Sequence, residues 1–191
     1  MIVVDGDEST NDTALLMANG QSGVEVVKDG VIDSHFQEGL NYLCIELAKK
    51  MAYDGEGATK FMEARVTGAL TTEDAKKAVH AVISSALFKS ALFGGDPNWG
   101  RIVSAVGYSG CEMNPDIITI SLENDEFSVD LVKEGKILAF DGTEELKTAE
   151  KIMLSKEIVV AINLNLANES AVGWGCDLTY DYVKINAEYT T

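Results

Sequence analysis

Residues 94–101, with the sequence Gly-Gly-Asp-Pro-Asn-Trp-Gly-Arg, divide the chain into a helix-rich part and a strand-rich part. Two adjacent glycines accept the positive φ angles that commonly end a helix, so the preceding helix is expected to stop here. Asp96 and Pro97 then predict an N-cap and a first helical residue. The segment therefore predicts a tight connection between two helices, in which Trp99 and Arg101 are free for further contacts.

The sequence before this connection predicts three strands and two helices. Short apolar or β-branched runs are typical of buried strands, and apolar residues that recur every three or four positions are typical of helices. The predicted strands cover residues 2–4, 13–18 and 61–66, and the predicted helices cover residues 34–54, with Ser34 as N-cap, and 71–93.

The sequence after the connection predicts mostly strands. A helix that starts at Pro97 is followed by strands at residues 117–122 and 127–132, a helix at 144–154 and strands at 157–166 and 178–185. Helices and strands in this order favour an α+β fold in which helices cover a mostly antiparallel sheet, close to a split βαβ arrangement with one extra helix. Since no flexible linker is present, we place the domain boundary near Gly57, between residues 1–57 and 58–191.

The net charge and the cysteine spacing limit which binding partners and which cellular environment the protein is expected to have. The 191 residues include 31 acidic and 15 basic side chains, and the formal net charge of −16 argues against binding to nucleic acids or anionic membranes. Three widely spaced cysteines, Cys44, Cys111 and Cys176, favour reduced thiols in a cytoplasmic protein over a disulfide framework or a zinc site. We see no export signal and no membrane-spanning run, and we expect no metal and no obligatory cofactor.

Self-contained catalytic motifs are absent from the sequence. There is no phosphate-binding loop, no dinucleotide fingerprint and no nucleophile elbow, and the two histidines have no visible partner. The candidate site is instead a set of separate polar groups. Glu56 lies between two glycines, which would let the backbone approach a ligand, although an exposed flexible turn explains the same pattern. The other candidates are Asn11, Asp12, Asn98, Arg101 and the polar C-terminus.

Four motifs in one order carry a family resemblance. They are Asp-Gly-Asp-x-Ser-Thr-Asn-Asp-Thr at residues 5–13, Gly-Glu-Gly-Ala-Thr-Lys at 55–60, Gly-Asp-Pro-Asn-Trp-Gly-Arg at 95–101 and Tyr-Val-Lys-Ile-Asn-Ala-x-Tyr-x-Thr at 182–191. Together they resemble the C-terminal part of the ornithine acetyltransferase family, the bifunctional glutamate N-acetyltransferases of arginine biosynthesis. The resemblance spans the whole chain from Met1 to Thr191.

The resemblance implies a mechanism. In that family a precursor cleaves itself before a threonine, and the new N-terminal threonine carries the acetyl group from N-acetylornithine to glutamate. The resemblance also implies that the enzyme is a heterotetramer of α and β chains. Acetyl-CoA is a further candidate donor of the acetyl group. The nucleophilic threonine of the family precedes the Asp-Gly-Asp motif and has no counterpart in these residues. We therefore expect residues 1–57 to be the remnant of an αββα nucleophile domain, and the chain to be inactive by itself.

Three substrate-binding positions follow from the resemblance. Glu56 matches the family glutamate that is expected to hold the α-amino group of ornithine or glutamate. Asn186 and Thr191 match the asparagine and the terminal threonine that reach into the same pocket. Asn11, Asp12, Asn98 and Arg101 lie in shared motifs, and for them structural caps and support of the site stay equally open.

Two other functions compete with the acetyltransferase. A non-catalytic interaction or regulatory module could keep this fold after the loss of the catalytic half. A relative of the self-cleaving N-terminal-nucleophile peptidases would share the architecture but should lack the motif at residues 95–101 and the C-terminal asparagine and threonine. An upstream reading frame that contains the threonine cleavage site would favour the enzyme.

Overall fold

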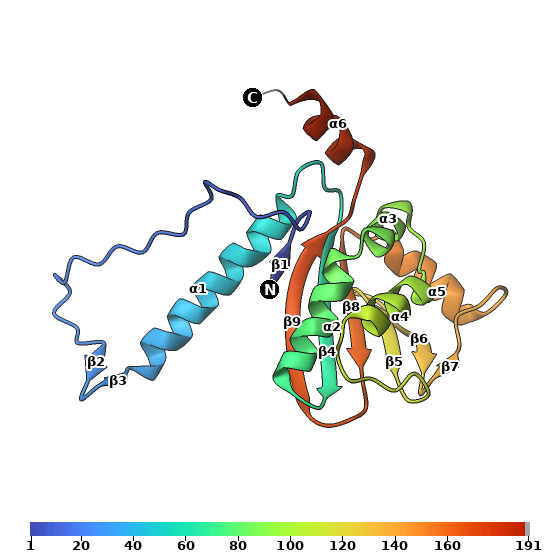
Figure 1. The fold of residues 1–191 in the computed structure, drawn as a ribbon, viewed down its shortest axis with the longest axis horizontal. Helices are drawn as coiled ribbons and strands as arrows, with labels where there is room; N and C mark the ends of the chain where they lie inside the picture. Colours follow the sequence, from blue (N-terminus) through green and yellow to red (C-terminus); the bar gives the residue numbers. More distant parts are fainter. Residues whose placement is uncertain (190–191) are drawn as a thin grey trace.

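The computed structural model describes residues 1–189, in which six helices and nine strands form a layered α+β fold (Figure 1). The helices are α1 Ser34–Tyr53, α2 Thr72–Ser84, α3 Ala86–Gly94, α4 Trp99–Tyr108, α5 Glu144–Met153 and α6 Tyr180–Glu188. The strands are β1 Ile2–Val3, β2 Val27–Lys28, β3 Val31–Ile32, β4 Phe61–Ala69, β5 Thr119–Glu123, β6 Ser128–Lys133, β7 Lys136–Ile137, β8 Glu157–Asn163 and β9 Glu169–Cys176.

Seven of the strands form one mixed sheet in the order β1-β9-β4-β8-β5-β6-β7. Neighbouring strands are antiparallel except for two parallel pairs, β1 with β9 and β4 with β8. Since β6 and β8 are both antiparallel to the β5 strand between them, they run in the same direction, and α5 connects them. This is the split βαβ arrangement that the sequence predicted, and the α+β class with a mostly antiparallel sheet is confirmed.

One face of the sheet carries the hydrophobic core. Side chains that alternate along β4, β5 and β8 lie fully buried and form one cluster with residues of α2, α3, α4 and α5. The opposite face mixes polar and apolar side chains, and Glu63 there accepts from Arg65 and from the indole Nε1 of Trp174. The last turns of α1 lie against that face, where the ring of Tyr53 stacks on Phe61 with centroids 4.3 Å apart.

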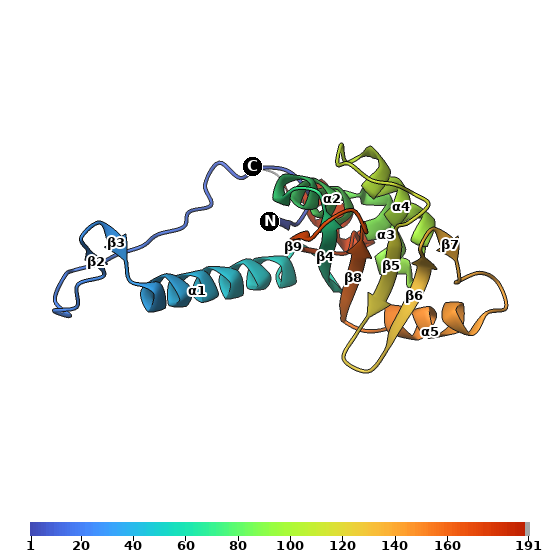
Figure 2. The ribbon, with the colours of Figure 1, turned by 90° about the horizontal axis from the view of Figure 1, so that it is seen from below.

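The N-terminal segment extends away from the sheet. Figures 1 and 2 show α1, the β2–β3 hairpin and the preceding chain projecting beyond the layered body. Residues 13–18, predicted as a buried strand, form no strand, and Leu15, Leu16 and Met17 are all exposed. The prediction was wrong because an apolar run becomes a strand only where another strand pairs with it. β1 lies before the predicted boundary at Gly57 yet pairs with β9, and the division at that residue stays a prediction.

Helix boundaries also differ from the sequence-based predictions. Asp33, and not Ser34, caps α1, with its carboxylate accepting the Phe36 N–H. The helix predicted over 71–93 is divided at Ser85, which ends α2 and caps α3 through the Phe88 N–H. Gly95 ends α3 with a φ of 73°, as expected of the glycine pair.

The N-cap of α4 lies two residues later in the sequence than predicted. Asn98, and not Asp96, is the N-cap, because its Oδ1 accepts the Arg101 N–H at 3.1 Å and α4 begins at Trp99. Pro97 therefore precedes the helix, where it is buried.

The C-terminal prediction was wrong in two ways. The final strand lies at Glu169–Cys176, a segment without a strand prediction, and residues 178–185, predicted as a strand, enter helix α6. Thr179 starts that helix, since its hydroxyl accepts the Tyr182 N–H at 3.2 Å. The helix lies at the surface and buries none of its residues.

Candidate functional site

Three segments that are far apart in the sequence meet at one edge of the sheet. β1 and β9 are parallel, so their carboxyl ends lie together, and β4 is antiparallel to β9, so β4 begins at the same edge. The chain that follows β1, the turn that precedes β4 and helix α6 after β9 are therefore neighbours. These segments carry the motifs at residues 5–13, 55–60 and 182–191.

Two of the predicted substrate-binding residues are in direct contact. The side-chain Nδ2 of Asn186 donates to Glu56 Oε2 at 2.7 Å and to the carbonyl oxygen of Tyr182 at 3.0 Å. The second bond joins positions four residues apart on α6 and orients the amide. Glu56 and Asn186 are both exposed, so the carboxylate keeps lone pairs available for a ligand.

A cleft of about 770 Å³ opens beside this pair. It is lined by β1, the loop after it, the last turn of α1 and the start of the Gly-Glu-Gly turn. Six of its lining residues are acidic and one is a histidine: Asp5, Asp7, Glu8, Asp12, Asp54, Glu56 and His80. Because like charges this close favour a cation between them, the cleft suits an amine more than a carboxylate or a phosphate.

Tyr182 links α6 to the loop after β1. Its hydroxyl donates to Asp5 Oδ2 at 3.1 Å. Burial raises the pKa of Tyr182, and so do the hydrogen bond to Asp5 and the negative charges around it. These causes act in one direction, because a phenolate would lose hydration on burial and would add one more negative charge to the acidic cleft.

A buried lysine holds the end of β1. The Lys89 ammonium, on α3, donates to the Val4 carbonyl oxygen and lies 3.9 Å from Cys176 Sγ. Burial lowers the pKa of Lys89, with the Cys176 thiol and nearby carboxylates acting in the opposite direction. Only 3% of Lys89 is exposed, so its role here is to position the backbone that leads into Asp5.

The Gly-Glu-Gly turn is held by Asp177, which is 3% exposed. Its carboxylate accepts the backbone N–H of Thr59 at 2.8 Å, the N–H of Lys60 at 3.1 Å and the Thr59 hydroxyl at 2.5 Å. Three donors satisfy a buried carboxylate and fix the backbone just after Glu56.

The remaining candidates lie in different places. Asp12 lines the cleft, whereas the hydrogen bonds of Asn11 stay within its own loop, where it accepts from the Thr10 and Thr13 hydroxyls and its N–H donates to Ser9 Oγ. Asn98 caps α4, and Arg101 Nη1 donates to the Leu87 carbonyl oxygen of α3 at 2.6 Å, so both lie in the connection between helices. Thr191 lies outside the described residues.

Sequence reasoning missed the side chains that support the site. Asp5, Asp177, Thr179 and Tyr182 contact or hold the two candidate segments, yet only their positions in or beside the shared motifs pointed to them. Their partners are more than 100 residues away in the sequence, so no local spacing could identify these contacts.

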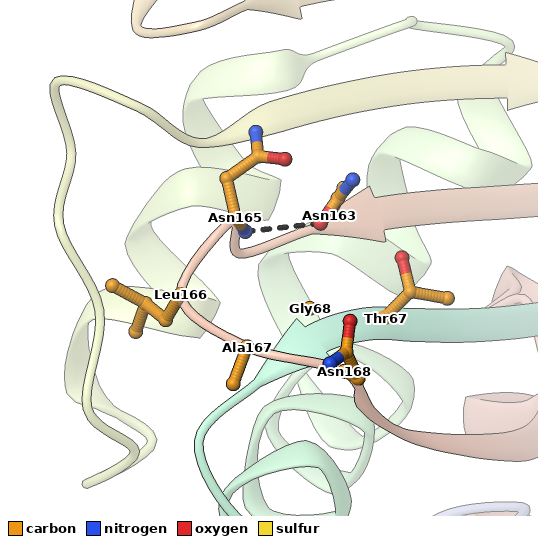
Figure 3. Close-up of a pocket in the computed structure, with 7 residues that line it drawn as sticks. All are labelled: Thr67, Gly68, Asn163, Asn165, Leu166, Ala167 and Asn168. Atoms are coloured by element: carbon orange, nitrogen blue, oxygen red, sulfur yellow. Dashed lines mark hydrogen bonds between the residues drawn. The ribbon is translucent and has the colours of Figure 1, made fainter.

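A second, smaller hollow lies at the opposite end of β4. Its volume is about 410 Å³, and Figure 3 shows the asparagines of the loop after β8 around Gly68. The Asn165 N–H donates to Asn163 Oδ1 at 2.9 Å, and a Cβ on Gly68 would lie 2.1 Å from that oxygen. These contacts close the loop onto β4 and leave no titratable side chain in the hollow.

Among the helices of residues 1–189, none has the length and apolarity that crossing a membrane requires.

The molecule is thus a layered α+β protein whose candidate site is an acidic cleft at one sheet edge. The model of the ArgJ family matches residues 1–191, and the chain belongs to this family. The family recognised from the four motifs is therefore confirmed.

Curated relatives carry an enzyme name. The chain is 55% identical to the glutamate N-acetyltransferase of Methanothermobacter thermautotrophicus over 191 residues, which is 100% of this chain and 46% of the relative. It is 56% identical to the glutamate N-acetyltransferase of Methanocaldococcus jannaschii over 190 residues, again 46% of the relative. The chain spans about half the length of the curated relatives it matches.

A solved structure has the same fold. The crystal structure of the arginine biosynthesis bifunctional protein ArgJ from Bacillus halodurans matches with a TM-score of 0.86 and 40% identity. The match covers 98% of this chain and 85% of that chain.

Proposed function

We propose that this chain forms the C-terminal part of a glutamate N-acetyltransferase and supplies the amine-binding side of its substrate pocket. The complete cytoplasmic enzyme would transfer the acetyl group of N-acetylornithine to glutamate, in arginine biosynthesis. Its partners are the α chain and the remainder of the β chain, and its assembly is an oligomer of these chains. Acetyl-CoA is a second candidate donor.

The contact between Glu56 and Asn186 is the observation that carries the proposal. A carboxylate oriented by an amide and open to solvent can accept a hydrogen bond from a substrate ammonium group, and charge strengthens such a bond. N-acetylornithine and glutamate differ in their side chains. The α-amino group is common to both half-reactions, because deacetylation of N-acetylornithine frees the α-amino group of ornithine and glutamate is acetylated on its own. Glu56 therefore recognises the part that the two half-reactions share.

The acidic cleft supports the proposal that this chain binds the substrate amines and that the other half of the enzyme binds the substrate carboxylates. Its carboxylates favour the amines of ornithine and glutamate but repel the carboxylates of both substrates. Cationic groups for those carboxylates, and donors for the oxyanion of the tetrahedral intermediate, would come from the other half of the enzyme.

The chemical step balances with a threonine hydroxyl from that other half. The hydroxyl oxygen attacks the acetyl carbonyl, the amide C–N bond breaks, and the proton leaves with the amine of ornithine. The α-amine of glutamate then attacks the acyl-threonine ester, and the threonine hydroxyl is restored. Glu56 would hold each amine beside the acyl carbon, so this chain alone would bind but not transfer.

The test is a Glu56→Gln variant of the complete enzyme, made by joining this chain to the N-terminal half of its own reading frame. Loss of one charge-assisted hydrogen bond is expected to raise KM for both amino acids by about 10-fold to 100-fold, from about 1.5–3 kcal/mol. Glu150→Gln, at an exposed position of α5, is the matched control and should behave as the parent enzyme. A folded complete enzyme that moves no acetyl group would overturn the proposal.

A further inference from the structure

We propose that Thr179 is a positioning residue that sets the distance between Glu56 and Asn186. The proposal rests on the function proposed above, since it concerns how that site is held together. The side chain itself is 5% exposed and does not line the cleft.

One hydroxyl group joins the two halves of the site. Thr179 Oγ1 donates to the carbonyl oxygen of Gly57 at 2.7 Å, and Gly57 directly follows Glu56. The same oxygen accepts the N–H of Tyr182 at 3.2 Å. This bond caps the start of α6, the helix that carries Asn186. Because a hydroxyl has one proton and two lone pairs, it can make both bonds at once.

The two backbones approach closely at this point. Gly57 has a φ of 66°, and a Cβ added to it would lie 2.7 Å from the Tyr182 backbone nitrogen and 2.9 Å from the Asp181 carbonyl carbon. The turn and the first turn of α6 are thus in direct backbone contact. A shift of the helix start moves Asn186 relative to Glu56, since Asn186 lies on the same nine-residue helix.

The remaining supports of the turn do not depend on Thr179. Asp177 holds Thr59 and Lys60, which follow the turn in the sequence, through three hydrogen bonds. The Gly-Glu-Gly turn should therefore stay folded when the Thr179 hydroxyl is removed. What is lost is the bond between turn and helix, together with the N-cap of α6.

This separation gives the residue a kinetic signature. In the complete enzyme, Thr179→Val should raise KM for glutamate and N-acetylornithine about tenfold, with kcat changed by no more than about twofold, because the geometry that binds the substrate amine is lost in both half-reactions. Thr179→Ser keeps the hydroxyl and should restore KM. Equal KM values in the valine variant and the parent enzyme, or a serine variant as impaired as the valine variant, would overturn the proposal.

A second measurement needs no catalysis and uses the chain as it stands. In a ¹⁵N-labelled sample, Glu56→Gln should shift the side-chain amide resonances of Asn186, because the bond to Glu56 changes its acceptor. The same Glu56→Gln change in a Thr179→Val background should shift them far less, and in a Thr179→Ser background as much as in the parent. A shift of equal size in the valine background contradicts the positioning role even if acetyl transfer is never observed. If the shift of the Asn186 resonances depends on the Thr179 hydroxyl but the complete enzyme transfers no acetyl group, the positioning role stands and only the proposed function is refuted.

Discussion

Lys60 Nζ lies 2.7 Å from the carbonyl oxygen of Met153, the last residue of α5, and 2.7 Å from that of Leu92 near the end of α3. Carbonyl groups in the last turn of a helix have no partner within the helix, and a lysine ammonium can donate to several of them. The final residue of the Gly-Glu-Gly-Ala-Thr-Lys motif is therefore turned away from the cleft and joins two helices to the start of β4.

Replacement of this lysine should lower stability. Lys60→Met removes two hydrogen bonds from a charged donor to partly buried carbonyls, and we expect the free energy of unfolding to fall by about 2–3 kcal/mol. Urea denaturation of the chain measures it. Lys76→Met, at an exposed position of α2, is the control and should change stability by less than about 0.5 kcal/mol. Equal midpoints for the two variants would contradict the capping role.

Asn98 offers a test of the alternative that the sequence left open. Its Oδ1 caps α4, so Asn98→Ala should lower the free energy of unfolding by about 1 kcal/mol, while Asn98→Ser, which keeps a capping acceptor and adds no charge beside Asp96, should lower it less. If Asn98 acts only as a cap, KM and kcat of the complete enzyme stay at the parent values in the folded alanine variant. A raised KM at full folding would instead assign Asn98 to the support of the site.

The sequence predicted the elements whose pattern reflects local structure. The helix stop at Gly95 and the alternation of β8 were readable because a left-handed glycine and a half-buried strand each leave a direct trace in the residue order. β9 left a weaker trace, since Gly173 and Gly175 have low strand propensity. The structure gives the reason for these glycines: a Cβ on Gly173 would lie 2.6 Å from Val79 Cγ1 of α2.

Residues 178–185 misled the pattern for the opposite reason. Leu178, Tyr180 and Tyr182 alternate there with polar residues as in a strand, but Val183 is 60% exposed and Ile185 is 43% exposed. Both lie on a surface helix, so their order does not report a buried sheet face. Sequence reasoning named candidate site residues only where flanking glycines or shared motifs marked them, as at Glu56, Asn186 and Asp12, and their substrate-binding role stays a prediction. Thr179 and Asp177 lie within or beside the mispredicted segment, and their partners are set by the sheet topology alone.

The approach of the turn to α6 predicts a contrast between two glycines. Gly57→Ala should lower the free energy of unfolding by about 1–2 kcal/mol, because the new Cβ meets the Tyr182 backbone and a positive φ is strained for alanine. Gly94→Ala should be neutral or stabilising by up to about 1 kcal/mol, since no atom lies within 4 Å of the added Cβ and Gly94 is still a helical residue, the last of α3 before the Gly95 cap. Thermal unfolding of the two variants compares them, and a destabilised Gly94→Ala or an unaffected Gly57→Ala would contradict the geometry.

The hydrogen bond from Tyr182 to Asp5 predicts a titration. Its acceptor is a carboxylate that favours the neutral phenol, so Asp5→Asn should lower the pKa of Tyr182 toward its ordinary value of 10.0. Since the folded-state pKa is raised, the stability that this group contributes is complete below pH 10 and is lost as the pH rises through the folded-state pKa. NMR of ¹³Cζ-labelled tyrosine follows the phenolate directly, and Tyr182→Phe identifies the resonance. Asp141→Asn, at an exposed position outside the cleft, should leave the pKa in place, and an unchanged value in Asp5→Asn would contradict the role of Asp5 and leave burial and the charges of Asp7 and Glu56 as the causes.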